Sequence, residues 1–155
     1  MTEQEFTRLF TMYRSGIYRL AYCSLRDPAD ADDVTQDVFL RLYTKAPELS
    51  SDEDVKAWLI RVTINRCRDS LRSMRRKAAE PITDILCTAD AEEHRLLSIV
   101  MQLSPKLRTV MYMYYYEEYS IKEIAKLLGI KETAVSSRLM RGRDKLRQLI
   151  EKEGI

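Results

Sequence analysis

The sequence has few of the residues that break helices, bridge chains or bind metals. Its 155 residues include only four glycines, four prolines, three cysteines and one histidine. So few glycines and prolines argue against a loop-rich β-protein and favour long helices. Because Cys23, Cys67 and Cys87 are far apart and His94 stands alone, neither a disulfide framework nor a zinc site is expected. We predict no metal, no cofactor, and reduced thiols in a cytoplasmic protein.

Long apolar runs are also missing. No stretch of about 18 apolar residues occurs, and the N-terminal segment has no apolar signal core. The sequence therefore predicts no direct insertion into a membrane. A single histidine, and the absence of a glycine loop that could cradle a phosphate, leave little chemistry for an enzyme that acts on nucleic acid. We expect a protein that is not an enzyme and has no small-molecule substrate.

The charge is small overall but unevenly distributed. The net charge is +2, from 26 lysines and arginines against 24 aspartates and glutamates. Residues 1–79 carry 14 basic and 12 acidic side chains, and residues 95–155 carry 12 basic and seven acidic ones. Between them, residues 80–94 carry five acids and no lysine or arginine. Two basic regions joined by an acidic segment suggest a polyanionic partner.

Helix-capping residues and helical periodicity predict an all-α fold. Helix starts are marked by Thr2, Asp27, Ser51, Ser104 and Ser120. The helices are expected at about 2–26, 28–45, 52–78, 91–103, 105–118, 121–128 and 132–151. No strand pattern competes with them. The prediction is two small helical bundles, residues 1–78 and 93–155, joined by an acidic linker at 79–92.

The last two predicted helices form a helix-turn-helix pattern. A short amphipathic helix is followed by a turn containing Gly129 and by a longer basic helix. Arginine can bond guanine with two hydrogen bonds, serine can bond a base or a phosphate, and methionine can contact a thymine methyl group. The alternative, an ordinary solvated helix, fits less well because residues 138–147 carry five bases against one acid. The residues expected to contact duplex DNA are Thr133, Ser136, Ser137, Arg138, Met140, Arg141 and Arg143.

The helix predicted at 28–45 begins with a cluster of acids. The helix dipole explains acids in the first turn but explains Asp37 poorly, because Asp37 lies beyond that turn. Leu40 falls on the same face as the acids, so the exposed face is both acidic and apolar. Such a face suits a basic protein partner better than DNA. The residues predicted to form it are Asp33, Gln36, Asp37, Leu40 and Arg41.

The helix predicted at 52–78 is basic on its outer side. Asparagine can bond an adenine edge, and aromatic and basic groups together suit single-stranded DNA. The residues predicted to contact such a strand are Trp58, Arg61, Val62, Asn65 and Arg66. For Trp58, a core position that plugs the end of the bundle is the alternative.

Three segments resemble one known family. DADDVTQDVFLRLY at 30–43 is similar to region 2.2 of sigma-70-type factors, and AWLIRVTINRCRD at 57–69 is similar to the following segment, which melts promoters and reads the −10 element. YSIKEIAKLLG at 119–129 and VSSRLMRGR at 135–143 resemble region 4, which reads the −35 element. Their order, their spacing and the short chain match the extracytoplasmic-function (ECF) subgroup, which has only regions 2 and 4.

The resemblance implies a function and its partners. The chain would bind core RNA polymerase at the β′ clamp helices and the β flap, and would direct it to promoter DNA. Region 2 would capture the −10 strand and region 4 would read −35 duplex, with an anti-sigma factor as inhibitor. A stand-alone helix-turn-helix regulator whose N-terminal bundle dimerises is the alternative. Two features depart from the family pattern: Ser136 replaces a commonly basic residue, and the loop at 50–54 is unusually acidic.

Overall fold

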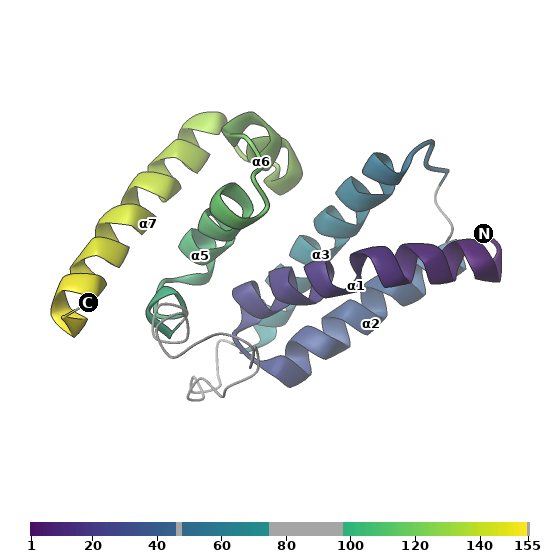
Figure 1. The fold of residues 1–155 in the computed structure, drawn as a ribbon, viewed down its shortest axis with the longest axis horizontal. Coiled ribbons are helices and arrows are strands. Elements are labelled where there is room, and N and C mark those ends of the chain that lie inside the picture. The colour runs from purple at the N-terminus through teal and green to yellow at the C-terminus, as the bar shows by residue number, and fades with distance from the viewer. Residues whose placement is uncertain (46–47, 75–97, 155) are drawn as a thin grey trace. The chain divides into compact units, whose positions relative to one another are not determined.

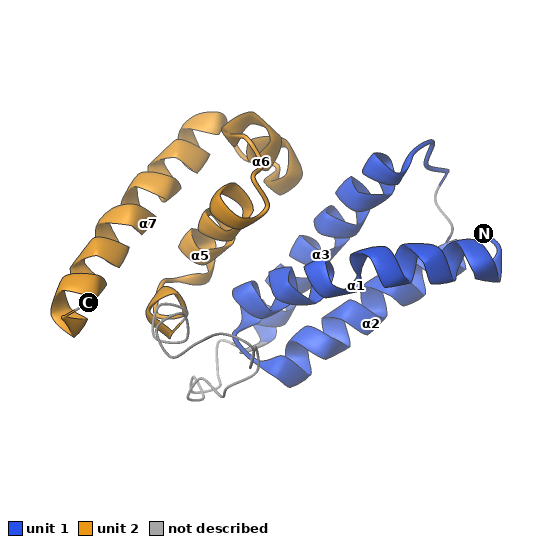
Figure 2. Ribbon diagram, viewed as in Figure 1, with its two compact units in different colours: residues 1–79 blue, residues 80–155 orange. Residues whose placement is uncertain are grey.

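The computed structural model describes residues 1–45, 48–74 and 98–154. These residues form two compact units, residues 1–79 and 80–155, which are coloured separately in Figure 2. Every regular element of the described residues is a helix, and none of those helices is long and apolar enough to cross a membrane. The all-α prediction is therefore confirmed. The predicted linker at 79–92, most of the predicted helix at 91–103, Cys87 and His94 lie outside the described residues.

The N-terminal unit is a bundle of three helices, each of which packs on the other two (Figure 1). The helices are α1 (Glu3–Leu25), α2 (Pro28–Lys45) and α3 (Asp52–Met74). Leu9, Phe39, Leu42 and Leu59 are its largest side chains with almost no exposed area. All three helices contribute to this core, so each helix has one buried side and one side left for other roles.

The predicted starts of these three helices are confirmed by hydrogen bonds. In each case a side-chain oxygen accepts from a backbone N–H in the first turn, which would otherwise lack a partner. The Glu5 N–H donates to the Thr2 hydroxyl at 3.2 Å, and the Ala29 N–H donates to the Asp27 carboxylate at 2.8 Å. The Asp54 N–H donates to the Ser51 hydroxyl at 3.2 Å.

The C-terminal unit is built around its last helix. A helical turn at 98–100 is followed by α5 (Pro105–Met111), the π-helix η1 (Tyr112–Tyr116), α6 (Ile121–Leu128) and α7 (Glu132–Glu153). Both α5 and α6 pack against α7. Their shared core includes Leu103, Met113, Ile124, Val135 and Leu139, each no more than 2% exposed.

The helix predicted at 105–118 is present, but it ends at Tyr116 and its second half is not α-helical. The α-helix stops at Met111 and continues as a π-helical turn, in which the Glu117 N–H donates to the Tyr112 carbonyl at 3.2 Å. Glu118 then adopts a left-handed φ of 59°, which ends the helix. The start is correct at Pro105, but the Ser104 hydroxyl makes no capping hydrogen bond. The residue inserted by the π-turn changes the direction in which the following side chains project.

The helix-turn-helix is confirmed in detail. Ser120 and Glu123 form the predicted reciprocal capping box at the start of α6. Gly129 ends α6 with a left-handed φ of 68°, a conformation that strains residues with a side chain. In α7, a methyl group at Gly142 would lie 2.9 Å from the Met111 sulfur, so α5 approaches α7 closely there.

Two of the three thiols can be described. Cys23 and Cys67 are buried free cysteines, and burial raises the pKa of Cys67 to about 12. A thiol in that state is a poor nucleophile. Within the described residues, no group of three or more histidines, cysteines or carboxylates is placed to hold a metal ion.

Candidate surfaces for a protein partner and for nucleic acid

The first candidate surface, the α2 surface, comprises Asp33, Gln36, Asp37, Leu40 and Arg41. The α2 surface faces away from the bundle, because the opposite side of α2 is buried against α1 and α3. Leu40 is 59% exposed, and Tyr43 one turn later is 48% exposed. Single exposed leucines are common on proteins. Here, however, Leu40 lies on the same helix face as the carboxylates, and the ring of Tyr43 one turn later meets the Phe6 ring of α1 edge to face. An exposed leucine beside acids suits a protein partner.

Asp37 links the α2 surface to α3. Its Oδ2 atom lies 3.1 Å from Arg41 Nε and 2.7 Å from Arg66 Nε. The contact with Arg66 is an ion pair without the alignment of a hydrogen bond. The three side chains keep 32–40% of their exposure, although the paired atoms Asp37 Oδ2 and Arg66 Nε have almost no exposed area themselves. Solvent therefore screens the pairs only in part, and their contribution to stability is modest. Asp37, predicted to contact a protein partner, and Arg66, predicted to contact DNA, thus lie together in the structure.

The second candidate surface, the α3 surface, comprises Trp58, Arg61, Val62, Asn65 and Arg66. The opposite side of α3 is buried, with Ile60, Thr63, Ile64 and Cys67 in the core of the bundle. Among the predicted DNA contacts, Arg61 and Asn65 are exposed, whereas Trp58 and Val62 are half-buried. Trp58 is thus neither a core residue nor a fully open ring. Arg66 stands at the edge of this surface because it is turned toward Asp37 on α2.

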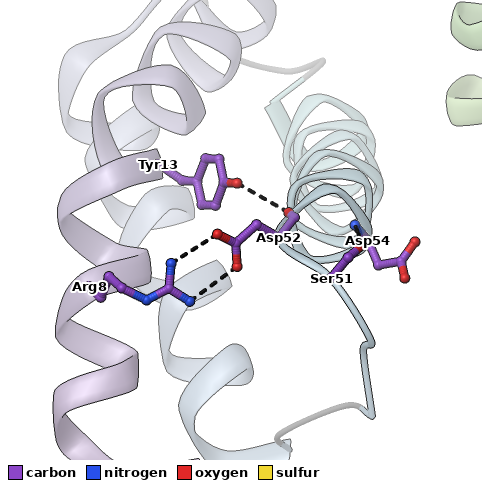
Figure 3. Close-up of polar contacts among 5 residues, drawn as sticks. All are labelled: Arg8, Tyr13, Ser51, Asp52 and Asp54. Atoms are coloured by element: carbon purple, nitrogen blue, oxygen red, sulfur yellow. Dashed lines mark hydrogen bonds and ion pairs between the residues drawn. The ribbon is translucent and has the colours of Figure 1, made fainter.

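The acids of segment 50–54 form the first turn of α3, where a helix dipole favours them, and their contacts explain them further (Figure 3). The Arg8 guanidinium donates two hydrogen bonds to the Asp52 carboxylate, at 2.9 and 3.1 Å, and the Tyr13 hydroxyl donates to the Asp52 carbonyl at 3.1 Å. The Asp54 carboxylate accepts from the Ser50 hydroxyl at 2.7 Å. These bonds keep the pKa of both carboxyls below the ordinary value of 3.8. Asp52 and Asp54 therefore stabilise the start of α3, and Arg8 of α1 pairs with the charge of Asp52.

The pair of Arg8 with Asp52 should stabilise the fold in a pH-dependent way. Arg8→Ala should lower the melting temperature at neutral pH, because Asp52 loses its paired cation. The pKa of Asp52 is lowered in the folded protein, so the pair stabilises above pH 3.8 and its effect is lost as the pH falls through the lowered value. Melting curves followed by circular dichroism should therefore show a wild-type-to-variant difference that shrinks at acidic pH.

Arg14→Ala is the matched control for this experiment. Arg14 lies on the same helix and its guanidinium carbon is 5.6 Å from the centre of the Phe10 ring. That contact involves no carboxyl group, so its loss should shift melting equally at neutral and acidic pH. A difference for Arg8→Ala that stays constant down to pH 3 would contradict the role given to Asp52.

The third candidate surface, the α7 surface, comprises Thr133, Ser136, Ser137, Arg138, Met140, Arg141 and Arg143. The opposite side of α7 is buried at Val135, Leu139 and Gly142. Met140 is 59% exposed. Thr133, Ser136, Arg141 and Arg143 are also exposed, whereas Ser137 and Arg138 are half-buried. One helix face thus presents hydroxyls, a thioether and guanidinium groups side by side.

Two features of the C-terminal unit were not among the predictions from the sequence. Five of the nine tyrosines fall between positions 112 and 119, and Arg143 Nε donates to the Tyr115 hydroxyl at 2.6 Å. The density of tyrosines in this segment was the one feature of the sequence that could have indicated an aromatic contact here. Arg108 was counted among the basic groups of the C-terminal region, yet it is 3% exposed and donates to the Met101 and Leu103 carbonyls. Its charge is therefore part of the core.

Comparisons with known proteins agree with this geometry. The sigma-70 region 2 family matches residues 9–77, and the sigma-70 region 4 family matches residues 93–146. The chain is 31% identical to the ECF RNA polymerase sigma factor SigM of Mycobacterium tuberculosis, over 94% of this chain and 76% of that protein. It is 26% identical to the ECF RNA polymerase sigma factor SigW of Bacillus subtilis, over 94% of this chain and 89% of that protein.

Solved structures show the same fold. CnrH, in complex with the cytosolic domain of CnrY, matches with a TM-score of 0.71 and 27% identity, over 97% of this chain and 90% of CnrH. The sigma factor RpoE, in complex with the anti-sigma factor NepR from Bartonella quintana, matches with a TM-score of 0.81 and 17% identity, over 96% of this chain and 98% of RpoE.

Proposed function

This chain belongs to the ECF sigma factors of RNA polymerase, and on that premise we propose how its three surfaces divide the work of transcription initiation. As a sigma factor, and not a stand-alone regulator, it binds core polymerase and directs it to promoters. Residues 1–78 would act as region 2, residues 93–155 as region 4, and residues 79–92 as the linker. Catalysis would remain with the polymerase, in the cytoplasm.

The α2 surface would dock on the β′ clamp helices. Leu40 supplies exposed apolar area, and Asp33 and Gln36 supply exposed polar groups around it. An apolar residue that the partner buries on binding, surrounded by polar groups, is the usual arrangement of a protein interface. Carboxylates at the rim would steer a basic partner and set its orientation.

The α3 surface would hold the −10 strand, and the α7 surface would read the −35 duplex. Arg61 and Asn65 are four residues apart on one exposed face of α3, with Trp58 and Val62 beside them. An aromatic ring next to basic and amide groups suits stacked or unpaired bases. On α7, Ser136, Met140 and Arg141 are exposed at the N-terminal half of a recognition helix.

One observation supports this division above the others. A single bundle presents an acidic and apolar surface on α2 and an arginine and asparagine surface on α3. A bundle used only for dimerisation would need neither. Because both solved neighbours are complexes with a second protein, an anti-sigma factor is proposed as the natural inhibitor.

Run-off transcription tests the proposal directly. Purified core polymerase with this protein, on a fragmented genomic library, should give transcripts whose upstream regions share one −35 and one −10 sequence. The protein alone should bind duplex promoter only weakly. Transcripts indistinguishable from those of core polymerase alone, together with tight sequence-specific binding by the isolated protein, would instead support a stand-alone regulator.

A further inference from the structure

We propose that Tyr115 is a positioning residue for promoter binding: its phenol holds Arg143 at the edge of the α7 surface as a fully charged ligand for a DNA phosphate. This inference rests on the proposed function, because it assumes that α7 lies against duplex DNA. Tyr115 is on η1 and Arg143 is on α7, 28 residues later in the chain. Helical spacing alone therefore does not create their contact.

The contact uses one nitrogen of the guanidinium and both neighbouring rings. Arg143 Nε donates to the Tyr115 hydroxyl at 2.6 Å, and the guanidinium carbon lies 5.8 Å and 6.0 Å from the ring centres of Tyr115 and Tyr114. The two rings meet edge to face at 5.0 Å between their centres. The geometry restricts a long side chain that would otherwise sample many rotamers, which lowers the entropy lost when it binds a partner.

The chemistry of the tether leaves the positive charge intact. An aspartate or glutamate in the same place would orient Arg143 equally well but would cancel its charge. A phenol is neutral at ordinary pH, and an aromatic ring attracts a cation without neutralising it. With Nε bonded to the phenol, the two terminal nitrogens can present paired donors to a phosphate.

Arg143 is also on the correct side of its helix. Ser136, Met140 and Arg143 follow one another at spacings of four and three residues, so they line one face of α7. All three are exposed. The π-turn in η1 brings Tyr115 to this edge: the residue inserted by the turn shifts the following side chains relative to an uninterrupted α-helix.

Charge substitutions at two adjacent tyrosines test the proposal. Tyr115 and Tyr116 are 54% and 60% exposed, so either position should accept glutamate without loss of the fold. The measurement is binding of the holoenzyme to a short −35 duplex at several salt concentrations. Tyr115→Glu should weaken binding by about tenfold and lower the salt slope by about 0.9, as Arg143→Ala should. Tyr116→Glu, with the same added charge, should weaken it by only about twofold and leave the slope nearly unchanged.

A milder variant and a double variant complete the design. Tyr115→Phe keeps both rings and removes one hydrogen bond, so it should cost about threefold in affinity with the salt slope retained. In an Arg143→Ala background, Tyr115→Glu should have no larger effect than Tyr116→Glu. Equal losses for the two glutamate variants, or a full Tyr115→Glu effect in that background, would overturn the proposal.

Failure of the inference can be separated from failure of the proposed function. Arg141→Ala serves as the reference. Arg141 belongs to the α7 surface, and in the described part of the chain it has no hydrogen bond or ion pair with Tyr115. If Arg141→Ala weakens binding and the two glutamate variants behave alike, only the role of Tyr115 is rejected. If Arg141→Ala also has no effect, the assignment of α7 to the −35 duplex is rejected with it.

Discussion

Leu40→Arg should reduce the affinity for core RNA polymerase by a hundredfold or more while leaving the helical fold intact. Leu40 is 59% exposed, so its replacement opens no cavity and the change in unfolding free energy should stay within about 0.5 kcal/mol. At the interface, the variant loses the burial of a leucine, about 2 kcal/mol, and places a cation against a basic partner. Together these losses predict roughly a hundred- to thousandfold weaker binding, measurable by fluorescence anisotropy with labelled protein.

Met12→Arg is the matched control. Met12 is 52% exposed on α1 in the same unit, so it tests the effect of adding one cation to an exposed apolar position elsewhere on the bundle. Its affinity for core polymerase should stay within about twofold of wild type. Equal losses for the two variants would mean that net charge, and not the α2 surface, governs binding. Asp37 is a less suitable probe, because its carboxylate also pairs with Arg41 and Arg66.

Helix positions were predictable because their signals are local. Asp27 followed by Pro28, Ser51 before α3, and Ser120 with Glu123 each fix a helix start within four residues of chain. The start at Ser104 was located by Pro105 although the serine makes no capping bond. The π-turn was not predictable in the same way. An α-helix and a π-turn share the same local propensities, and the inserted residue is accommodated through packing of the C-terminal unit.

The sequence predicted which side of each helix is exposed, but not which side chains pair between helices. Periodicity placed Leu40 and Asn65 on outer helix faces, as observed. The ion pair of Asp37 with Arg66 joins residues 29 positions apart, and that of Arg8 with Asp52 spans 44. Such pairs depend on how the bundle closes, which no spacing rule gives. The acids of segment 50–54 therefore departed from the family pattern in the sequence, and only the structure shows that Arg8 of α1 pairs with Asp52.

The pairing of Asp37 with Arg66 has a consequence for initiation. The same carboxylate belongs to the surface proposed for polymerase and restrains an arginine proposed for DNA. A polymerase cation that draws Asp37 away would release Arg66, so docking and strand capture would be coupled through one side chain. The coupling would be modest, because the three side chains keep 32–40% of their exposure. It would therefore adjust strand capture and not switch it on or off.

The second large effect is expected at Arg141, on the recognition helix. Arg141→Ala should lower holoenzyme transcription from −35-dependent promoters by about five- to 150-fold, since a bidentate contact between arginine and a base is worth roughly 1–3 kcal/mol. Arg141 is exposed, and the neighbouring buried residues Leu139 and Gly142 hold α7 in place without it. The fold and the affinity for core polymerase should therefore be unchanged, which melting and binding measurements on the same preparation can check.

Arg147→Ala distinguishes reading of a base from attraction to phosphate. Arg147 lies farther along α7, is 70% exposed, and pairs loosely with Asp144 at 3.8 Å. If it meets phosphate, its loss should weaken binding to all sequences alike and lower the salt slope by about one. Loss of Arg141 should instead relax discrimination at one base pair of the −35 element, because a side chain that bonds a base edge penalises the wrong base. An Arg141→Ala variant that weakens matched and scrambled −35 duplexes by the same factor would reassign Arg141 to the phosphate backbone, leaving Ser136, Ser137 and Met140 to read the sequence.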